Sequence, residues 1–450
     1  MRLSQSIAWL LTSFASEGLC SEIESQLQSG LVDKNVADVA GGDVAQRANL
    51  VSTPIASLVE VHEVIVTMED VPDKPRPRHE QEKKNLMKRL SKSHGKWDTN
   101  HPRHRLMEAL FGFSRYKARQ MAELNRWKDL YTHVLEKTIG YSKKFETAET
   151  LHDLNQELCN EIVEAALEYY GVSHEELAAH SKAKDAANQL ADRVSVSQAL
   201  KHFVRDWSTS GRGEREDAFP CILSTMESLF PDRSDKDMKV LLPGSGIGRL
   251  GHEIASLGGI DVTINEWSMF MNLAYRFLEA HPRPGAKSVH PFIDSWSHHA
   301  TNDDMFRGVS FPDARVNASS VLLVEGDFVT QFKSHKGEYD AIITHFFIDT
   351  ARNVMSYFDV IHAALKPGGY WINFGPLLWG TGPFVQLSLD EIISIAKTMG
   401  FELMKTTGMC GEITFEGEVV RGKRAVYGFN EMALTENAYS AQFWVARKSF

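Results

Sequence analysis

The spacing of apolar positions changes about halfway along the chain, and the second half predicts a sheet. From about residue 238 onward, short apolar runs recur at 239–242, 262–265, 321–324, 339–344 and 370–374. A loop rich in Gly, Asp or Asn follows each run, and helical segments lie between them. This alternation predicts a doubly wound α/β sheet, with ligands bound at the carboxyl ends of its strands. Two further runs, 424–429 and 441–447, are typical of a hairpin at the edge of such a sheet.

The first half carries a helical pattern instead. Between about 100 and 235, apolar residues recur at intervals of three or four positions, which indicates amphipathic helices. No repeat of fixed period is present, so we expect a helical N-terminal cap domain over 81–235 and a Rossmann-like domain over 236–450. Residues 1–80 end in a proline-rich stretch, and we expect a poorly ordered extension and linker there.

Composition narrows the class of protein. A chain of 450 residues with 43% hydrophobic residues is long enough for two domains with sizeable cores. The formal net charge of -10 argues against nucleic acid as a partner, because proteins that bind phosphates normally carry a basic surface. A basic run at 74–92 is most simply a solvated linker that enters a helix. No stretch approaches the roughly 18 apolar residues of a membrane span, so we expect no membrane partner.

The four cysteines, Cys20, Cys159, Cys221 and Cys410, are far apart in the sequence and have no histidine at ligand spacing. They predict neither a metal site nor a disulfide framework, and they fit a reducing compartment best. We therefore expect a cytoplasmic protein, with the nucleus as a second location. The apolar stretch at 7–15 is similar to a weak secretion signal, although an amphipathic helix is the simpler interpretation. The sequence does not give the oligomeric state, and a homodimer stays open.

A glycine-rich loop is the strongest functional signal. Residues 240–249, VLLPGSGIGR, run from an apolar strand into three glycines and then into an amphipathic helix. Gly244, Gly246 and Gly248 leave a surface without side chains and permit positive φ, as a loop around a nucleotide-type cofactor requires. The next strand ends at Glu266, about twenty residues further on, where a carboxylate can accept both hydroxyls of a ribose. For the glycines alone, an ordinary strand-to-helix turn is the plainer alternative.

The glycine spacing separates two classes of cofactor enzyme. Dinucleotide-dependent oxidoreductases carry G-x-G-x-x-G, whereas here the third glycine comes one residue early and Arg249 stands in the last position. This spacing is similar to that of S-adenosylmethionine-dependent methyltransferases. Residues 366–369, KPGG, are similar to the tight turn that the same superfamily commonly carries before its fifth strand. Two independent motifs therefore favour a methyltransferase.

Several longer motifs occur together. They are FVRDWS at 203–208 with ER at 214–215, VLLPGSGIGRL at 240–250, NEWS at 265–268, GDF at 326–328, FFIDTA at 346–351 with Asn353, and KPGGYWINFGPLL at 366–378. In this combination the chain resembles the carnosine N-methyltransferase family from about 105 to 448. The resemblance implies a Rossmann-like enzyme that uses S-adenosyl-L-methionine to methylate the imidazole of the dipeptide carnosine, giving anserine.

The resemblance implies contacts with both ends of the cofactor. Arg205, one turn after His202 on a predicted helix, would bind the cofactor carboxylate with two parallel hydrogen bonds, the alternative being a solvated helix charge. The family has glutamine where His202 stands. We expect Asp327 to accept from the adenine amino group and Phe328 to wall the ring. His345 would line the methyl-transfer channel, unless it is simply a buried, hydrogen-bonded histidine.

Asp349 is the expected catalytic and substrate-binding residue. Methyl transfer needs the lone pair of a neutral imidazole nitrogen. A carboxylate that accepts the other ring N–H fixes the tautomer and raises the basicity of the attacking nitrogen. The alternative is an N-cap for a helix at 350–365, and the two roles are compatible.

Residues after the fifth strand are expected to complete the substrate pocket. Asn373, Gly375, Pro376 and Trp379 would form one wall, and Tyr439 would donate its hydroxyl to the dipeptide.

Gly380 departs from the family pattern, which has a histidine at this position that reaches the substrate. The departure leaves methyl transfer intact and the acceptor open, so a different small-molecule or peptide acceptor is one alternative. A catalytically silent cofactor-binding protein is another. The retained Glu266 and Asp349 argue against the silent protein, as the glycine spacing argues against an oxidoreductase.

Overall fold

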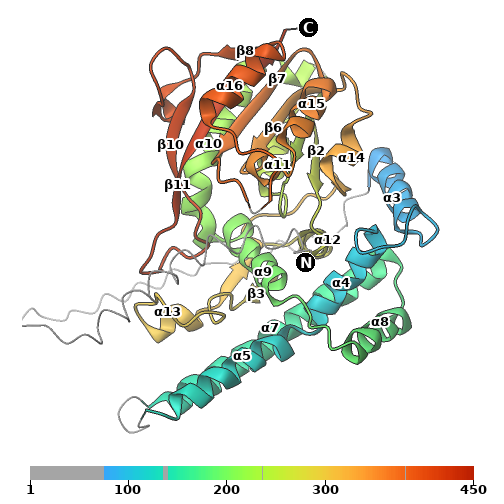
Figure 1. Ribbon diagram of the computed structural model, residues 1–450, viewed down its shortest axis with the longest axis vertical. Helices are drawn as coiled ribbons and strands as arrows, with labels where there is room; N and C mark the ends of the chain where they lie inside the picture. Colours follow the sequence, from blue (N-terminus) through green and yellow to red (C-terminus); the bar gives the residue numbers. More distant parts are fainter. Residues whose placement is uncertain (1–74, 135–139, 236, 381, 450) are drawn as a thin grey trace, which may run out of the picture. The chain divides into compact units, whose positions relative to one another are not determined.

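The computed structural model describes residues 75–134, 140–235, 237–380 and 382–449 (Figure 1). The apolar stretch at 7–15 and most of the predicted extension lie outside the described residues. The first described element is helix α3 (Pro77–Leu90), which begins with a proline, a residue suited to the first helical turn. Leu86 and Leu90 of this helix are buried in the main core.

The central sheet has the strand order β5-β2-β1-β6-β7-β11-β10-β9, and β8 also pairs with β11. Its strands are β1 (Met238–Pro243), β2 (Ile260–Glu266), β5 (Val321–Glu325), β6 (Tyr339–His345), β7 (Leu365–Gly375), β8 (Phe401–Met404), β9 (Glu412–Ile413), β10 (Arg421–Val426) and β11 (Ala438–Lys448). Strands β5, β2, β1, β6 and β7 are parallel, whereas β11 runs antiparallel to its neighbours. The five predicted parallel strands and the closing hairpin are confirmed.

Strand β1 marks the point where the strand order reverses. It pairs with β2 on one side and with β6 on the other, both in parallel. The chain proceeds from β1 to β2 and β5 in one direction and returns to add β6 and β7 in the other. In open α/β sheets such a switch point leaves a crevice at the carboxyl ends of the strands. The glycine loop that follows β1 therefore lies at the place where a ligand is expected.

Helices surround the sheet and extend from it (Figure 1). In the first half these are α4 (Pro102–Ser114), α5 (Tyr116–Tyr131), α7 (Tyr141–Tyr170), α8 (His174–Ala186), α9 (Arg193–Trp207) and α10 (Arg212–Leu229). The later helices are α11 (Arg249–Ser256), α12 (Met269–Ala280), α13 (Asn302–Phe306), α14 (Phe328–Phe332), α15 (Val354–Ala364) and α16 (Leu389–Thr398). A separate two-stranded sheet pairs β3 (Lys287–Val289) with β4 (Val309–Phe311). Helix α7 packs against α4, α5 and α12, which connects the helical half to the sheet half.

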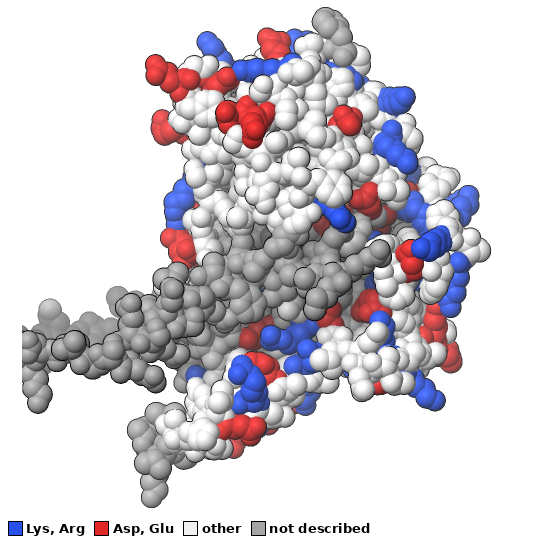
Figure 2. Space-filling view, viewed as in Figure 1, with Lys and Arg blue, Asp and Glu red and all other residues white. Residues whose placement is uncertain are grey.

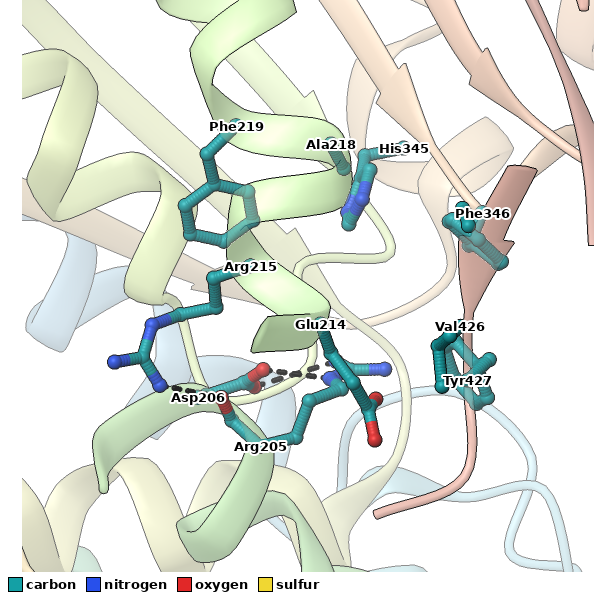
Figure 3. A pocket seen from close by; sticks show the side chains of 11 residues that line it. Arg205, Asp206, Glu214, Arg215, Ala218, Phe219, His345, Phe346, Val426 and Tyr427 are labelled. Atoms are coloured by element: carbon teal, nitrogen blue, oxygen red, sulfur yellow. Dashed lines mark hydrogen bonds and ion pairs between the residues drawn. The ribbon is translucent and has the colours of Figure 1, made fainter. Parts of the chain in front are cut away.

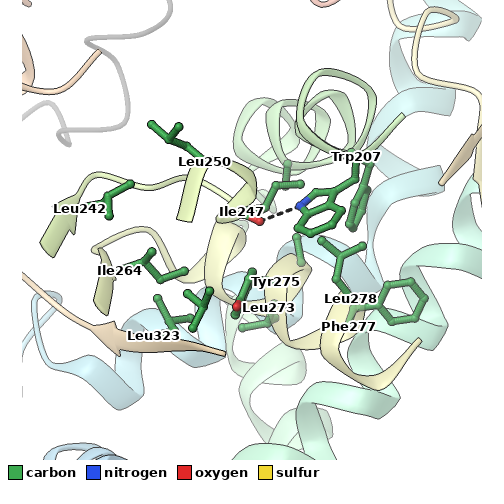
Figure 4. Packing of buried hydrophobic residues seen from close by; sticks show 14 of the residues in the cluster. Trp207, Leu242, Ile247, Leu250, Ile264, Leu273, Tyr275, Phe277, Leu278 and Leu323 are labelled. Atoms are coloured by element: carbon green, nitrogen blue, oxygen red, sulfur yellow. Dashed lines mark hydrogen bonds between the residues drawn. The ribbon is translucent and has the colours of Figure 1, made fainter. Parts of the chain in front are cut away.

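Alternate residues of the central strands face two hydrophobic clusters. Val240 and Leu242 of β1 belong to the cluster that includes α9, α10, α11 and α12, whereas Leu241 belongs to the cluster with α14, α15 and α16. This is the period of two that a strand covered on both faces requires. Trp207, at the end of α9, donates its indole N–H to the carbonyl of Ile247 at 2.8 Å (Figure 4). The bond fixes α9 against the glycine loop.

A disulfide corrects one expectation. Cys221 of α10 and Cys410 of the short 3-10 helix η5 (Gly408–Cys410) are bonded, with their Cα atoms 5.2 Å apart. The prediction that the cysteines form no disulfide is wrong for this pair. The two residues are 189 positions apart, so only the folded chain brings them together.

Charged side chains of both signs are mixed over the helices at the lower edge of the view in Figure 2. Among the described residues, no helix is both long enough and apolar enough to cross a membrane.

Candidate active site

The glycine loop has the backbone that its sequence predicts. Gly244, Gly246 and Gly248 have φ values of +65°, +57° and +82°. A Cβ atom at Gly244 would lie 2.2 Å from Cδ2 of Phe347, and one at Gly248 would lie 2.7 Å from Cε2 of Tyr275. Both the conformation and the lack of space therefore require glycine here.

Glu266 lies at the carboxyl end of β2 and faces the glycine loop. Its Oε2 accepts from the backbone N–H of Gly246 at 3.0 Å, and its Oε1 accepts from that of Ser268 at 2.7 Å. Burial raises the pKa of the Glu266 carboxyl, and these backbone donors act against the rise. The carboxylate is thus fixed beside the loop by two backbone donors, and its role as a ribose acceptor stays a prediction.

Helix α9 places two predicted residues against the loop. A Cβ atom at Gly246 would lie 3.3 Å from Cδ2 of His202 and 3.7 Å from Nη2 of Arg205. Arg205 donates from Nε to Oδ1 of Asp206 at 2.7 Å, and its guanidinium carbon lies 4.7 Å from the ring centroid of Tyr427. Burial lowers the pKa of Arg205, but the charge of Asp206 outweighs it and the net shift is upward. Burial and the charge of Arg205 lower the pKa of His202 to about 4, so its imidazole is neutral.

A pocket opens beside Arg205. It is lined by residues of α9, α10, the end of β6 and the end of β10: Arg205, Asp206, Glu214, Arg215, Ala218, Phe219, His345, Phe346, Ala425, Val426 and Tyr427. Figure 3 shows Arg205 and Asp206 at one end of the pocket and His345, the last residue of β6, beside Ala218 of α10 at the other end. Nε2 of His345 is buried without a hydrogen-bond partner among the described residues. Burial and the charge of Arg205 lower the pKa of this histidine to about 3. The alternative of a fully hydrogen-bonded histidine is therefore wrong for Nε2.

Asp349 lies in the 3-10 helix η4 (Ile348–Thr350), just after β6, and is 8% exposed. Its Oδ2 accepts from the backbone N–H of Leu378 at 3.0 Å. Burial raises its pKa to about 7. Helix α15 begins at Val354 with Asn353 as its N-cap, so the alternative of Asp349 as a helix cap is wrong. The carboxylate is instead a buried group near the end of the sheet.

Two predicted substrate contacts lie near this region. The charge of Asp349 contributes, after burial, to a raised pKa of Tyr439. The Tyr439 ring centroid lies 5.9 Å from that of Phe346, a residue of the pocket wall. Trp379 donates its indole N–H to the carbonyl of Leu387 at 2.9 Å, which fixes the loop after β7.

Asn373 has a different place from the one expected. It is fully buried, accepts from the hydroxyl of Thr344 at 2.8 Å and donates to the carbonyl of Gln442 at 3.0 Å. Its amide connects β6, β7 and β11. The expectation that Asn373 walls the pocket is wrong, because both ends of its amide are used inside the sheet.

Asp327 and Phe328 follow β5 as predicted. Oδ1 of Asp327 accepts from the backbone N–H of Thr330 at 2.8 Å and caps helix α14. Phe328 is buried, with its ring 5.5 Å from that of Phe347. Asp327 is therefore the N-cap of α14, and its contact with adenine stays a prediction.

Arg105 of α4 is a candidate that the sequence interpretation missed. Its guanidinium carbon lies 3.8 Å from the ring centroid of Trp267, the residue after Glu266. Its Nη2 is buried without a partner among the described residues. Burial lowers its pKa to about 10, while the charges of Glu266 and Asp327 act in the opposite direction. Nothing in the helical period of α4 distinguishes Arg105 from Arg103 on the same helix, which pairs with Glu176.

The sheet and its loop define a class of enzyme. A glycine loop at the switch point, an acid at the end of the adjacent strand and an antiparallel strand beside β7 are the features of a Rossmann-like, S-adenosylmethionine-dependent methyltransferase. Within this class the chain belongs to the carnosine N-methyltransferase family, whose model matches residues 182–450.

Individual relatives agree with the family match. A carnosine N-methyltransferase of Schizosaccharomyces pombe is 34% identical over 276 residues, which cover 56% of this chain and 70% of that protein. A carnosine N-methyltransferase of Rattus norvegicus is 32% identical over 308 residues, which cover 66% of this chain and 73% of that protein.

Solved structures show only a weak likeness. Haemonchus contortus phosphoethanolamine N-methyltransferase 2, in complex with S-adenosyl-L-methionine, is 15% identical with a TM-score of 0.29, over 47% of this chain and 44% of that one. Magnesium protoporphyrin IX methyltransferase from Synechocystis, with bound SAH, is 12% identical with a TM-score of 0.30, over 54% and 88%.

Proposed function

We propose that this protein transfers a methyl group from S-adenosyl-L-methionine to an imidazole nitrogen of carnosine, giving anserine, or of a related histidine-containing dipeptide. Membership of the family supports the reaction class. The observation that supports an imidazole acceptor is Asp349, a buried carboxylate after β6 whose pKa is about 7. Such a group can hold a neutral imidazole by its N–H.

The residues around the glycine loop fit this cofactor. The bare surface at Gly246 lies next to Arg205, which can hold a carboxylate, and next to Glu266, which can accept ribose hydroxyls. His202 and His345 border the same region as neutral imidazoles. Bound there, the cofactor supplies a methyl group made electrophilic by a positively charged sulfur.

The adenosine end is assigned to residues beyond Glu266. Asp327 and Phe328 follow the adjacent strand β5, as an adenine contact requires. Arg105 completes this end in our proposal, because its unpartnered Nη2 and its stacking on Trp267 place a donor beside two acids.

Asp349 has two tasks in this proposal. Its carboxylate accepts the imidazole N–H that is not attacked, which leaves the lone pair of the other nitrogen pointing at the methyl group. The ring proton lost after transfer can then pass to the same carboxylate, whose pKa of about 7 suits an acceptor near neutral pH. Tyr439 and Trp379 hold the remainder of the dipeptide in this proposal.

Gly380 favours a second candidate, a methyltransferase with another small-molecule or peptide acceptor. A glycine offers no side chain to the substrate, so the contact that the family's histidine would make is missing from this chain. Only the acceptor differs between the two candidates, since the cofactor residues are common to both.

The test of the catalytic assignment is the Asp349→Ala variant. We expect kcat/KM for carnosine to fall by about 10²–10⁴-fold, while the Kd for S-adenosylhomocysteine stays within about twofold. Asp340→Ala is the matched control, because Asp340 lies near the start of strand β6, at the end away from Asp349, where it pairs with Lys366. A near-normal rate for Asp349→Ala would remove the catalytic role, and a joint loss of cofactor binding would make Asp349 a structural residue.

A further inference from the structure

Glu214 supplies an unusual carboxylate to the wall of the pocket. It lies in the first turn of α10, and its Oε1 accepts from the backbone N–H groups of Gly428 at 3.1 Å and Phe429 at 2.5 Å. Its Oε2 is buried and has no hydrogen-bond partner among the described residues. A buried carboxylate oxygen left in this way is costly unless a donor occupies the site.

The charges around the pocket leave Glu214 uncompensated. Arg205 is paired with Asp206, and Arg215 donates to Asp313 at 2.6 Å. No ion pair of Glu214 is present in the part of the chain that the structure describes. Among the described residues, the two arginines of the pocket wall are therefore paired with carboxylates other than Glu214, which has no cation at ion-pair distance.

Arg205 and Glu214 form a pair of opposite charges that a ligand can bridge. Both line the same pocket, and Figure 3 shows the Glu214 carboxylate beside the Arg205 guanidinium. Burial raises the pKa of the Glu214 carboxyl, and the nearby charge of Arg205 acts against this rise. An α-amino acid carries a carboxylate and an ammonium on one carbon. Arg205 suits the first group and Glu214 the second.

The turn that Glu214 holds adds a wall to this subsite. Phe429 has a φ of +60°, a strained value for a residue with a side chain. The ring centroid of Phe429 lies 5.1 Å from that of His202 and 5.5 Å from the guanidinium carbon of Arg205. The two backbone bonds to Glu214 thus keep an aromatic ring over the same part of α9.

We propose that Glu214 is a binding residue for a primary ammonium group, with its free Oε2 as the acceptor. The inference rests on the proposed function, in which Arg205 holds the amino-acid end of the cofactor. The geometry favours the cofactor ammonium, because it lies on the same carbon as the carboxylate. The amine of the dipeptide, on its β-alanine, is the other source of this chemistry.

The Glu214→Gln variant separates charge from structure. The amide oxygen of glutamine can still accept from Gly428 and Phe429, so the variant removes the negative charge and retains the turn. Glu216→Gln is the matched control, since Glu216 lies on the same helix but is exposed and paired with Arg212. Two ligand pairs identify the source of the ammonium: S-adenosylhomocysteine against 5′-methylthioadenosine, which lacks the amino-acid end, and carnosine against N-acetylcarnosine.

We expect Glu214→Gln to weaken S-adenosylhomocysteine binding by about 10- to 100-fold, with the Kd for 5′-methylthioadenosine unchanged. A raised KM for carnosine but not for N-acetylcarnosine, with cofactor binding intact, would also support an ammonium site and assign it to the dipeptide. Equal losses for both adenosine ligands, or no loss for any ligand, would overturn the proposal. If wild-type protein binds S-adenosylhomocysteine but leaves carnosine unmethylated, the proposed acceptor fails, and the cofactor comparison still tests Glu214.

Discussion

Asp349 combines two properties that oppose each other, since it is buried and, in the proposed function, must be charged to orient an imidazole. Burial raises its pKa from 3.8 to about 7, and the backbone N–H groups of Leu378 and of Asp349 itself act against the rise. Burial of such a group lowers the free energy of unfolding, a cost that active sites often carry because the group is needed for the reaction.

This conflict predicts a pH-dependent gain in stability for Asp349→Asn. Between pH 3.8 and about 7 the unfolded chain loses the proton that the folded chain keeps, so burial of Asp349 lowers the free energy of unfolding as pH rises through this window. Asparagine does not titrate. The free energy of unfolding of the variant, relative to that of the wild type, should therefore increase by roughly 2–3 kcal/mol from pH 5 to pH 8, as urea unfolding can measure. A difference that stays constant with pH would show that Asp349 is not strained by burial.

At this scale the residue pattern places candidate site residues that follow strands. His202 and Arg205 of helix α9 are predicted only through the family resemblance, and Arg105 and the role of Glu214 are missed. Glu266 and Asp349 come directly after apolar runs, and the carboxyl ends of parallel strands meet at one edge of the sheet. Glu214 and Arg105 lie on helices whose period shows only that they are amphipathic. Their unpartnered atoms result from packing between segments far apart in the chain, which no local pattern records.

The glycine loop is the element whose sequence specifies its conformation most completely. Its three positive φ values require glycine, and the packing of Phe347 and Tyr275 against it leaves no room for a side chain. The loop is also held from outside by Glu266 and by Trp207 of α9. Its shape is therefore set by contacts within the chain.

Gly244→Ala should damage both stability and cofactor binding. The new Cβ would lie 2.2 Å from the ring of Phe347, which cannot move freely because it stacks on Tyr357. We expect a loss of about 2–4 kcal/mol in unfolding free energy and at least a tenfold weaker affinity for S-adenosylhomocysteine.

Gly95→Ala is the control for this substitution. Gly95 also has a positive φ, +72°, but nothing lies within 4 Å of the added Cβ. It should lose only about 1 kcal/mol and bind the cofactor normally, as calorimetry can measure. Equal effects of the two substitutions would mean that backbone strain, and not the contact with Phe347, accounts for the loss caused by Gly244→Ala.

Element boundaries were less predictable than element types. The long apolar strands were found, whereas β3, β4, β8 and β9 are four residues or shorter and carry too little period to be recognised. The helix expected from Thr350 begins only at Val354, because a 3-10 turn holds Asp349 in the site first.

At the scale of the whole molecule, the helical half and the sheet half share one hydrophobic core. Leu106 and Tyr170 belong to the same buried cluster as Val240 and Phe374. The sequence predicts two kinds of secondary structure here, but it does not show that they pack into a common core. The spacing of apolar residues along a helix or strand indicates which of its faces is buried, but not which other element covers that face.

The disulfide joins helix α10 to the 3-10 helix η5 covalently and can be tested directly. Cys221 and Cys410 are bonded, so reduction of the denatured protein should release the two thiols of this pair in addition to those that titrate without reductant. Replacing both bonded cysteines by serine should lower the free energy of unfolding by about 2–5 kcal/mol. Dithiothreitol should destabilise the wild type similarly and leave the double variant unaffected. Four free thiols in the unreduced protein would contradict the bond.

The acceptor is the central claim, and one measurement tests it most directly. Purified protein is incubated with S-adenosyl-L-methionine and, separately, with carnosine, homocarnosine, free histidine and histidine-containing peptides, and the products are identified by mass spectrometry. The account predicts that carnosine gains one methyl group on its imidazole and that Asp349→Ala abolishes this product. Cofactor binding without methylation of any imidazole compound would contradict the account.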